Sequence, residues 1–381
     1  MTGDHERPRS WWNIVALIAT LGLTAVVAVV AVTRSDRVGP EAEGSPTATA
    51  SPSPSPTAPG KLAGRGPYIV YATASGEVFA YDTAVKVWVA MGNVDAPSVR
   101  QHIRQPSSGL VAAFATEAGT VWRVDREGLA RVALLPLSDP STLEGGTVSR
   151  DGRRFAIATT GRDPELMIVN LGNGRTSALP RRTGSGNRYP EDTPLVPIGW
   201  SLGGSLVYQL PICSCPEETP GLYLYDLAAE QSTLVDATAR EIVDRVAISP
   251  DGQEVVWGDG QSLRKLAAGR RSASVLRRIP RGRIFSNVRW STDGASLLLA
   301  IASADPDGED TTLELADPES GDQRREVTGI PEDGFSVALL PGRLIIVEAG
   351  VDAERRLLTF IDGRESVVAG EGSPVFLGWL R

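Results

Sequence analysis

Histidine, cysteine and lysine are scarce in this sequence, and their scarcity excludes several kinds of site. The 381 residues include two His, two Cys and, among 38 basic residues, only three Lys. Because no histidine follows His102, a serine nucleophile later in the chain has no downstream histidine as its general base. The two Cys have no His nearby to complete the four ligands usual for zinc. The sequence therefore identifies no catalytic, cofactor-binding or metal-binding residue.

The charge of the chain argues against nucleic acid as a partner. The formal net charge is −8, and residues 1–40 contribute +1 from four Arg and three acidic residues, so the remainder carries about −9. An acidic domain is repelled by a phosphate backbone. With 41% hydrophobic and 22% charged residues, the composition is globular and provides ample material for a core.

One long apolar run lies near the start of the chain. Residues 10–33 contain no charged side chain, and Ile14 to Val32 is apolar apart from Gly and Thr. As a helix this run is roughly 28 Å long, about the thickness of one hydrocarbon core, and Trp11 and Trp12 stand where an interfacial aromatic belt would lie. The run predicts a transmembrane helix over residues 13–32. A cleaved signal peptide is the alternative, although the run exceeds the usual length of about 7–15 apolar residues.

A segment rich in Ser, Thr and Pro separates this run from the rest of the chain. Residues 39–61 contain no aromatic residue and no Val, Leu or Ile, so they cannot bury enough apolar surface to fold. Their prolines favour an extended spacer of about 50 Å. Such stalks suit the outside of a cell. We therefore expect a single-pass protein of the cell membrane with a cytoplasmic tail (1–12), the membrane helix, an extracytoplasmic linker (33–65) and a folded domain (66–381).

The folded domain is built from a repeated unit, of which residues 287–302 are the clearest copy. This stretch predicts a strand, a tight turn at Thr292-Asp293-Gly294 and an apolar strand from Leu297 to Ala302. Corresponding turn glycines recur every 42 to 52 residues, at Gly109, Gly152, Gly204, Gly252, Gly294 and Gly342. Most copies end their third strand with Asp or Asn, as at Asp317, whereas the copy that starts near Ile248 lacks it. A period of this length is typical of a four-stranded propeller blade.

The two ends of the repeat region complement each other. Val375 to Trp379 resembles a first strand, whereas Tyr68–Ala72, Val78–Asp82 and Val87–Met91 resemble second, third and fourth strands without a first. Pairing them would make one composite blade, close the ring and remove open sheet edges. The sequence thus predicts an all-β fold, a seven-bladed β-propeller. Six blades is the alternative if one weak copy is an insertion.

The turns resemble those of a known repeat family. The residues that carry the resemblance are Trp290-Ser291-Thr292-Asp293-Gly294, Ser249-Pro250-Asp251-Gly252, Ser149-Arg150-Asp151-Gly152 and Trp200-Ser201-Leu202-Gly203-Gly204. They are similar to the WD40-like (PD40) repeats of TolB-type propellers, over most of residues 66–381. The resemblance implies an envelope protein that binds partners through the faces and central opening of the propeller. The predicted anchor and stalk, and the lack of a recognisable N-terminal α/β domain, depart from the family. The Arg and Ala bias suggests a GC-rich genome, as in actinobacteria.

Two motifs resemble functional sites when taken alone. Gly199 to Gly203 matches G-x-S-x-G, the nucleophile elbow, but that elbow needs a following helix, and Ser205 to Leu210 is predicted as a strand. A blade turn is therefore the better interpretation. Asp305 to Asp310 is acidic enough to suggest calcium, but it lacks the residue order of an EF-hand loop, so a solvated loop is favoured.

The two cysteines stand one residue apart, between two predicted strands. In an oxidising exterior Cys213 and Cys215 are expected to form a local disulfide. Free thiols are one alternative, and a soft metal held by the two thiolates is another.

Two polar loops contain the candidate partner-contact residues, because propeller connections often carry function. These residues are Arg181, Arg182, Arg188 and Tyr189 in one loop and Glu217 and Glu218 in the other. A solvated connection is the alternative for the first loop. A second basic region, which includes Arg277 and Arg278, could also meet an anionic wall polymer.

The sequence fits a binding module better than a catalyst. We predict a membrane-tethered, extracytoplasmic propeller that binds an envelope protein or a cell-wall polymer, without a cofactor or nucleic acid. The alternative is a hydrolase or lyase, or a ligand-binding module, acting on wall glycan or peptide at the central opening. Acids with raised pKa around that opening would favour the enzyme, whereas a smooth, partly apolar face would favour a protein partner. The oligomeric state is open, and a monomer is compatible with the sequence.

Overall fold

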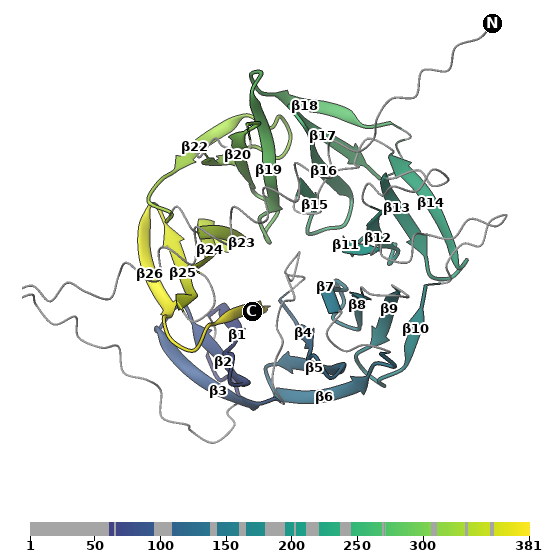
Figure 1. Cartoon of the computed structure of the whole chain (residues 1–381), viewed down its shortest axis with the longest axis vertical. Helices are drawn as coiled ribbons and strands as arrows, with labels where there is room; N and C mark the ends of the chain where they lie inside the picture. Colours follow the sequence, from purple (N-terminus) through teal and green to yellow (C-terminus); the bar gives the residue numbers. More distant parts are fainter. Residues whose placement is uncertain are drawn as a thin grey trace, which may run out of the picture. The chain divides into compact units, whose positions relative to one another are not determined.

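Antiparallel pairing of consecutive strands organises the folded domain. The computed structural model describes residues 61–64, 66–94, 109–137, 143–159, 165–179, 195–201, 203–210, 221–236, 245–268, 270, 272–305, 311–331, 334–350 and 354–381. Within these ranges 27 strands form seven sheets arranged in a ring, six sheets of four strands and one of three (Figure 1). The predicted seven-bladed β-propeller is confirmed, and the six-bladed alternative is wrong.

Blade 1 joins the two ends of the domain. From the centre outwards its strands are β27 (Val375–Leu380), β1 (Tyr68–Ala72), β2 (Glu77–Asp82) and β3 (Val87–Asn93). β27 and β1 are antiparallel, with Tyr68 opposite Leu380 and Ala72 opposite Val375. This pairing confirms the predicted composite blade, and the predicted strand ends agree with the observed ones within two residues.

The other blades follow one another along the chain, and each runs outwards from the centre (Figure 1). Blade 2 has β4 (Ala112–Ala115), β5 (Thr120–Asp125) and β6 (Gly128–Leu134), and residues 95–108, which precede it, lie outside the described ranges. Blades 3 to 5 consist of β7 (Leu143–Val148), β8 (Arg154–Thr159), β9 (Leu166–Asn170), β10 (Thr176–Ala178); β11 (Val196–Trp200), β12 (Leu206–Leu210), β13 (Gly221–Asp226), β14 (Gln231–Asp236); and β15 (Val246–Ile248), β16 (Glu254–Asp259), β17 (Ser262–Ala267), β18 (Ser274–Arg278). Blades 6 and 7 consist of β19 (Arg283–Trp290), β20 (Leu297–Ser303), β21 (Thr312–Ala316), β22 (Gln323–Val327); and β23 (Gly334–Leu340), the 3₁₀ turn η3 (Pro341–Arg343), β24 (Leu344–Ala349), β25 (Arg356–Ile361), β26 (Arg364–Ala369).

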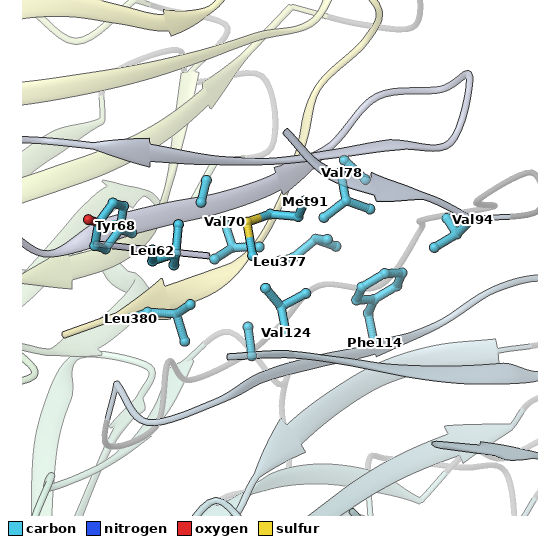
Figure 2. Packing of buried hydrophobic residues seen from close by; sticks show 13 residues of the cluster. Leu62, Tyr68, Val70, Val78, Met91, Val94, Phe114, Val124, Leu377 and Leu380 are labelled. Atoms are coloured by element: carbon cyan, nitrogen blue, oxygen red, sulfur yellow. The ribbon is translucent and has the colours of Figure 1, made fainter. Parts of the chain in front are cut away.

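Apolar side chains fill the space between neighbouring blades. Figure 2 shows one such cluster, in which Val70 and Leu377 of blade 1 pack with Phe114 and Val124 of blade 2. All four side chains are fully buried. Burying a large apolar side chain stabilises a fold by about 1.5–3 kcal/mol. Packing between blades, as well as hydrogen bonding within them, therefore holds the ring closed. Leu62, just before β1, belongs to the same cluster and fixes the start of the domain.

The Asp at the end of most third strands caps the turn that follows. In blade 1 the Asp82 carboxylate accepts the backbone N–H of Ala84 at 2.9 Å, and in blade 6 Asp317 accepts that of Glu319 at 2.7 Å. A short acidic side chain that bonds the backbone two residues ahead favours a turn. Blade 5, the weakest copy in the sequence, has Ala267 at this position.

The predicted membrane segment precedes the residues that the structure describes. Residues 1–12 and 13–32 lie outside the described ranges, as does nearly all of the linker. In the part of the chain that is described, no helix has the length and apolar character needed to cross a membrane. The anchor and the domain boundaries before residue 61 therefore stay predictions.

Replacing Gly378 with Ala should destabilise the ring. Gly378 lies on β27 with a φ of +145°, and a Cβ added there would lie 3.0 Å from the Cβ of Ala112 in blade 2. Backbone strain of this kind costs about 1–3 kcal/mol, so we expect Gly378→Ala to lower the free energy of unfolding by about that amount in urea titrations. Gly370→Ala is the matched control, because its added Cβ would meet Val367 at an ordinary 3.7 Å. Equal stability of the two variants would contradict this account.

A buried carboxylate connects blade 7 to blade 1. Glu348 on β24 is 4% exposed, and its Oε1 accepts the backbone N–H of Phe376 on β27 at 2.7 Å. Burial raises the pKa of Glu348, against the opposing effects of that hydrogen bond and of the Arg355 charge. Because the folded-state pKa lies above the unfolded value of about 4.3, the contribution of Glu348 to stability is complete below that value. It is lost as the pH rises through the folded-state pKa.

We expect Glu348→Gln to be at least as stable as the native protein at about pH 8. The amide oxygen can still accept the Phe376 N–H, and no charge is buried. Thermal unfolding of both proteins between about pH 4 and pH 8 measures the difference, which should grow with pH. Glu365→Gln, on the exposed part of β26, is the control. If the native protein instead gained stability over the glutamine variant as the pH rose, the carboxylate would be stabilised in its charged form and this account would be wrong.

Candidate functional site

A cavity opens at one mouth of the ring. Its volume is about 560 Å³. Its wall is formed by the ends of β7, β11, β15 and β19, the turns that follow β7, β15 and β19, the β21–β22 turn, and Arg381 after β27. Because the innermost strands run in the same direction, the turns that follow them lie together on one face of the propeller, which we call the turn face. Five blades therefore contribute to a single site.

The turn after β15 shows how the sequence forms this wall. The Ser249 hydroxyl donates to the Asp251 carboxylate at 2.5 Å and accepts the backbone N–H of Glu254 at 2.9 Å. Asp251 also accepts the N–H of Gln253 at 3.0 Å. Gly252 has a φ of +73°, which glycine adopts without strain. The S-x-D-G motif thus encodes a turn that satisfies its own hydrogen bonds.

The same turn recurs in other blades. In blade 3 the Ser149 hydroxyl donates to Asp151 at 2.6 Å, and the turn of blade 6 repeats the serine and aspartate bonds to the backbone. In blade 4 the Ser201 hydroxyl accepts the backbone N–H of Ser205 at 3.2 Å. Ser201 is therefore a turn residue followed by a strand, and the G-x-S-x-G match is a blade turn, as predicted.

These bonds keep Asp151 and Asp251 ionised. Burial alone would raise the pKa of Asp151 and of Asp251, but hydrogen bonds from serine and from the backbone, with nearby arginine charges, outweigh it and lower both pKa values. For Asp251 the arginine is Arg150. A carboxylate with a lowered pKa and occupied lone pairs is a poor general acid at neutral pH.

The residue between serine and aspartate lines the cavity. This position holds Arg150 in blade 3, Pro250 in blade 5 and Thr292 in blade 6. Trp200 and Trp290, the last residues of β11 and β19, also line the cavity. Their indole N–H groups donate to backbone carbonyl oxygens at 3.3 and 3.4 Å, which fixes the two rings as walls.

Arg150 reaches across part of the mouth. From the turn of blade 3 its Nη1 donates to the backbone carbonyl oxygen of Asp251 in blade 5, at 2.9 Å. Blade 4 lies between these two blades in the ring, so the Arg150 side chain connects turns that are not adjacent.

Carboxylates outnumber cations around the cavity. The charged residues of the lining are Asp251, Glu254, Asp293, Glu319, Arg150 and Arg381. Lys265 on β17 lies 3.0 Å from Glu254 and 2.8 Å from Glu319. Burial alone would lower the pKa of Lys265, but the two glutamates outweigh it and raise the pKa. Counting Lys265, four carboxylates and three cations surround the cavity, which leaves a net charge of −1.

The site residues that the sequence analysis identified lie outside the described part of the chain. They are Cys213, Cys215, Arg181, Arg182, Arg188, Tyr189, Glu217 and Glu218. The strand ends that bracket the two loops, Ala178 and Val196 for one and Leu210 and Gly221 for the other, lie at the face opposite the turn face. The disulfide and the partner contacts therefore stay predictions.

The remaining candidates add no metal site to the described ranges. In those ranges no group of three or more His, Cys, Asp or Glu side chains is arranged to hold a metal ion. Most of the acidic segment considered for calcium, residues 306–310, falls outside them. Arg277, from the second basic region, forms an ion pair with the buried Glu314 of blade 6, so its charge serves the contact between blades.

Comparison with known proteins identifies the fold. No family model and no curated protein matches the sequence. Among solved structures, the β-propeller domain of Cps50 (Swd1) from Myceliophteria thermophila is similar with a TM-score of 0.52 and 14% identity, over 79% of this chain and 98% of that one. TolB from Acinetobacter baumannii has a TM-score of 0.49 and 18% identity over 82% of both chains. A Lactobacillus plantarum protein has a TM-score of 0.49 and 14% identity over 82% of this chain and 99% of that one. The likeness to Cps50 shows a β-propeller and nothing beyond the fold.

Variation within the turn motif is the sequence signal that marks the cavity. The residue x of S-x-D-G is Arg150, Leu202, Pro250 or Thr292, while serine and glycine repeat around it. The neighbouring serine and glycine shape the turn, so the varying position is the one that makes the lining differ from blade to blade. This varying position holds Arg150 and Thr292, which stand in short turns and not in the long polar loops that the sequence marks by composition.

Removing the turn serine should weaken the turn and change its acid sensitivity. Ser249→Ala deletes the hydroxyl bonded to Asp251 and to the Glu254 N–H, and we expect a loss of about 1–2 kcal/mol in the free energy of unfolding. The lowered pKa of Asp251 means that its contribution to stability is present above the unfolded value of about 3.9 and is lost as the pH falls through the folded-state pKa. The variant should lose less stability than the native protein over that acidic range.

The measurement is urea unfolding of both proteins from about pH 7 down to about pH 3. Ser272→Ala, which alters an exposed serine in the β17–β18 turn, is the matched control. A Ser249→Ala protein as stable as this control at neutral pH would show that the turn does not depend on the serine.

Proposed function

We propose that this chain is a binding module that recognises a protein partner through its turn face. The observation that carries the proposal is the cavity at the centre of that face, to which five blades contribute. Its wall consists of hydrogen-bonded turns and two fixed tryptophans, so the surface is formed before the partner arrives. A preformed surface loses little conformational entropy on binding.

The chemistry of the cavity favours binding over hydrolysis. A glycosidase of the usual type needs a carboxylic acid with a raised pKa beside its scissile bond. The pKa of Asp251, which lines the cavity, is lowered instead. Glu348, whose pKa is raised, lies on β24 against β27 and is not part of the cavity lining. These observations support a partner-binding role for the cavity.

We extend the proposal to the location of the protein. The charge-free apolar run from Ile14 to Val32 and the Ser/Thr/Pro-rich linker support a propeller held outside the cell by a membrane anchor. The resemblance of the S-x-D-G turns to TolB-type repeats supports a partner in the bacterial envelope. A cell-wall polymer is the competing partner.

The proposal is tested by photo-crosslinking in living cells. A photoreactive amino acid is placed at Ser320 or Asn173, exposed residues in turns on the turn face, and in parallel at Glu117 or Gln261, exposed residues on the opposite face. We expect one recurrent protein to be captured from the turn-face positions and identified by mass spectrometry. Capture of a protein from the opposite-face positions alone would assign the interface to that face and overturn the proposal. Recovery of wall glycan in place of a protein would also overturn it.

A further inference from the structure

Resting on the proposed function, we propose that the cavity takes a basic side chain of the partner, and that Arg150 occupies the same place in the free protein. The ligand class is a guanidinium or ammonium group presented by an arginine or lysine in an exposed segment. The segment docks on the turn face, and its basic group enters the cavity in competition with Arg150.

The position of Arg150 shows that the cavity accommodates a guanidinium. Its Nη1 donates to the Asp251 carbonyl oxygen at 2.9 Å, and its positive charge helps to lower the pKa of the Asp251 carboxylate. Arg150 is exposed and stands in a turn whose shape is set by Ser149 and Asp151, so its own side chain is not needed to form that turn. A cation from a partner could therefore replace it without disturbing the fold.

The charge of the wall favours a cation over an anion. Of the four lining carboxylates, Glu254 and Glu319 share one cation, Lys265, and the lining itself adds Arg150 and Arg381, so the wall keeps one negative charge in excess. The Arg381 guanidinium lies 5.6 Å from the centre of the Trp379 ring, which already supplies it with a cation–π contact. An anion would have to approach four carboxylates to reach these arginines.

A buried hydroxyl provides an independent indication of a polar ligand. Thr292 lines the cavity, is 7% exposed, and its Oγ1 has no hydrogen-bond partner among the described residues. A buried hydroxyl without a partner is costly to a fold, and after a rotation of the Thr292 side chain toward the cavity it would accept a hydrogen bond from an arginine or lysine N–H. The volume of about 560 Å³ is within the range of ligand pockets and leaves room beyond the Arg150 side chain.

The test uses the full-length chain and two blocked tripeptides, Ac-Gly-Arg-Gly-NH2 and Ac-Gly-Glu-Gly-NH2, titrated by calorimetry at low salt. We expect saturable binding of the arginine peptide only. Asp293→Asn and Glu319→Gln should each weaken it by about two- to fivefold, because each removes one charge next to the cation. Arg150→Ala should strengthen it by about two- to fivefold, because the internal competitor is gone. Arg364→Ala, which removes an exposed arginine from the outer strand β26, is the matched control and should change nothing.

Each outcome decides the question. The inference is overturned if Arg150→Ala weakens the binding of the arginine peptide or leaves it unchanged. It is also overturned if the two peptides bind equally well. Binding of the glutamate peptide that is lost in Arg150→Ala would assign an anionic ligand instead. If Asp293→Asn does not fold, Glu319→Gln carries the charge test, since this side chain is mostly exposed. If crosslinking from Ser320 and Asn173 captures a protein but the peptides show no preference, the inference fails while the proposed function stands. If no protein is crosslinked from Ser320 or Asn173, the proposed function fails as well.

Discussion

The antiparallel pairing of β27 with β1 is the contact on which the rest of the ring depends. It brings together the two ends of the domain and completes the innermost position of blade 1. Apolar clusters then continue from blade 1 into blade 2 on one side and into blade 7 on the other. Polar bonds between the blades follow, as from the Trp88 indole to the Val368 carbonyl oxygen at 2.8 Å. Contacts between residues so distant in sequence carry a large chain-entropy cost, which these two interfaces must offset together.

Closure of the ring also fixes the shape of the cavity. The innermost strands end at the same mouth, so any opening between two blades would move turns that now line one site. Within each turn, serine and aspartate bond the backbone, and glycine supplies the left-handed residue. The turn face therefore consists of elements with little freedom to adapt, and in the proposed binding role its specificity would depend on the few side chains that these elements leave unused.

The fold could be predicted from the sequence because its determinants are local and repeated. Gly294 and its counterparts mark each blade, and Tyr68–Ala72 with Val375–Trp379 indicates a composite one. The site could not be predicted in the same way. Arg150 and Asp251 are about a hundred residues apart, and the sequence does not show that blades 3 and 5 approach each other across the opening. Polar residues are instead dense in loops such as Arg181 to Tyr189, whose flanking strand ends lie at the other face.

The same repetition explains why the cavity wall differs between blades only where the pattern breaks. Most copies keep the serine and the third-strand Asp or Asn, whose side chains bond backbone N–H groups, and every copy keeps the turn glycine, which adopts a positive φ without strain. A propeller assembled from identical copies would present the same residue from every blade. This chain departs from that symmetry at one position of the turn, where an arginine, a proline and a threonine stand around one cavity. The asymmetry costs little stability, since x makes no bond that the turn requires, and it is therefore the position where recognition can change without loss of the fold.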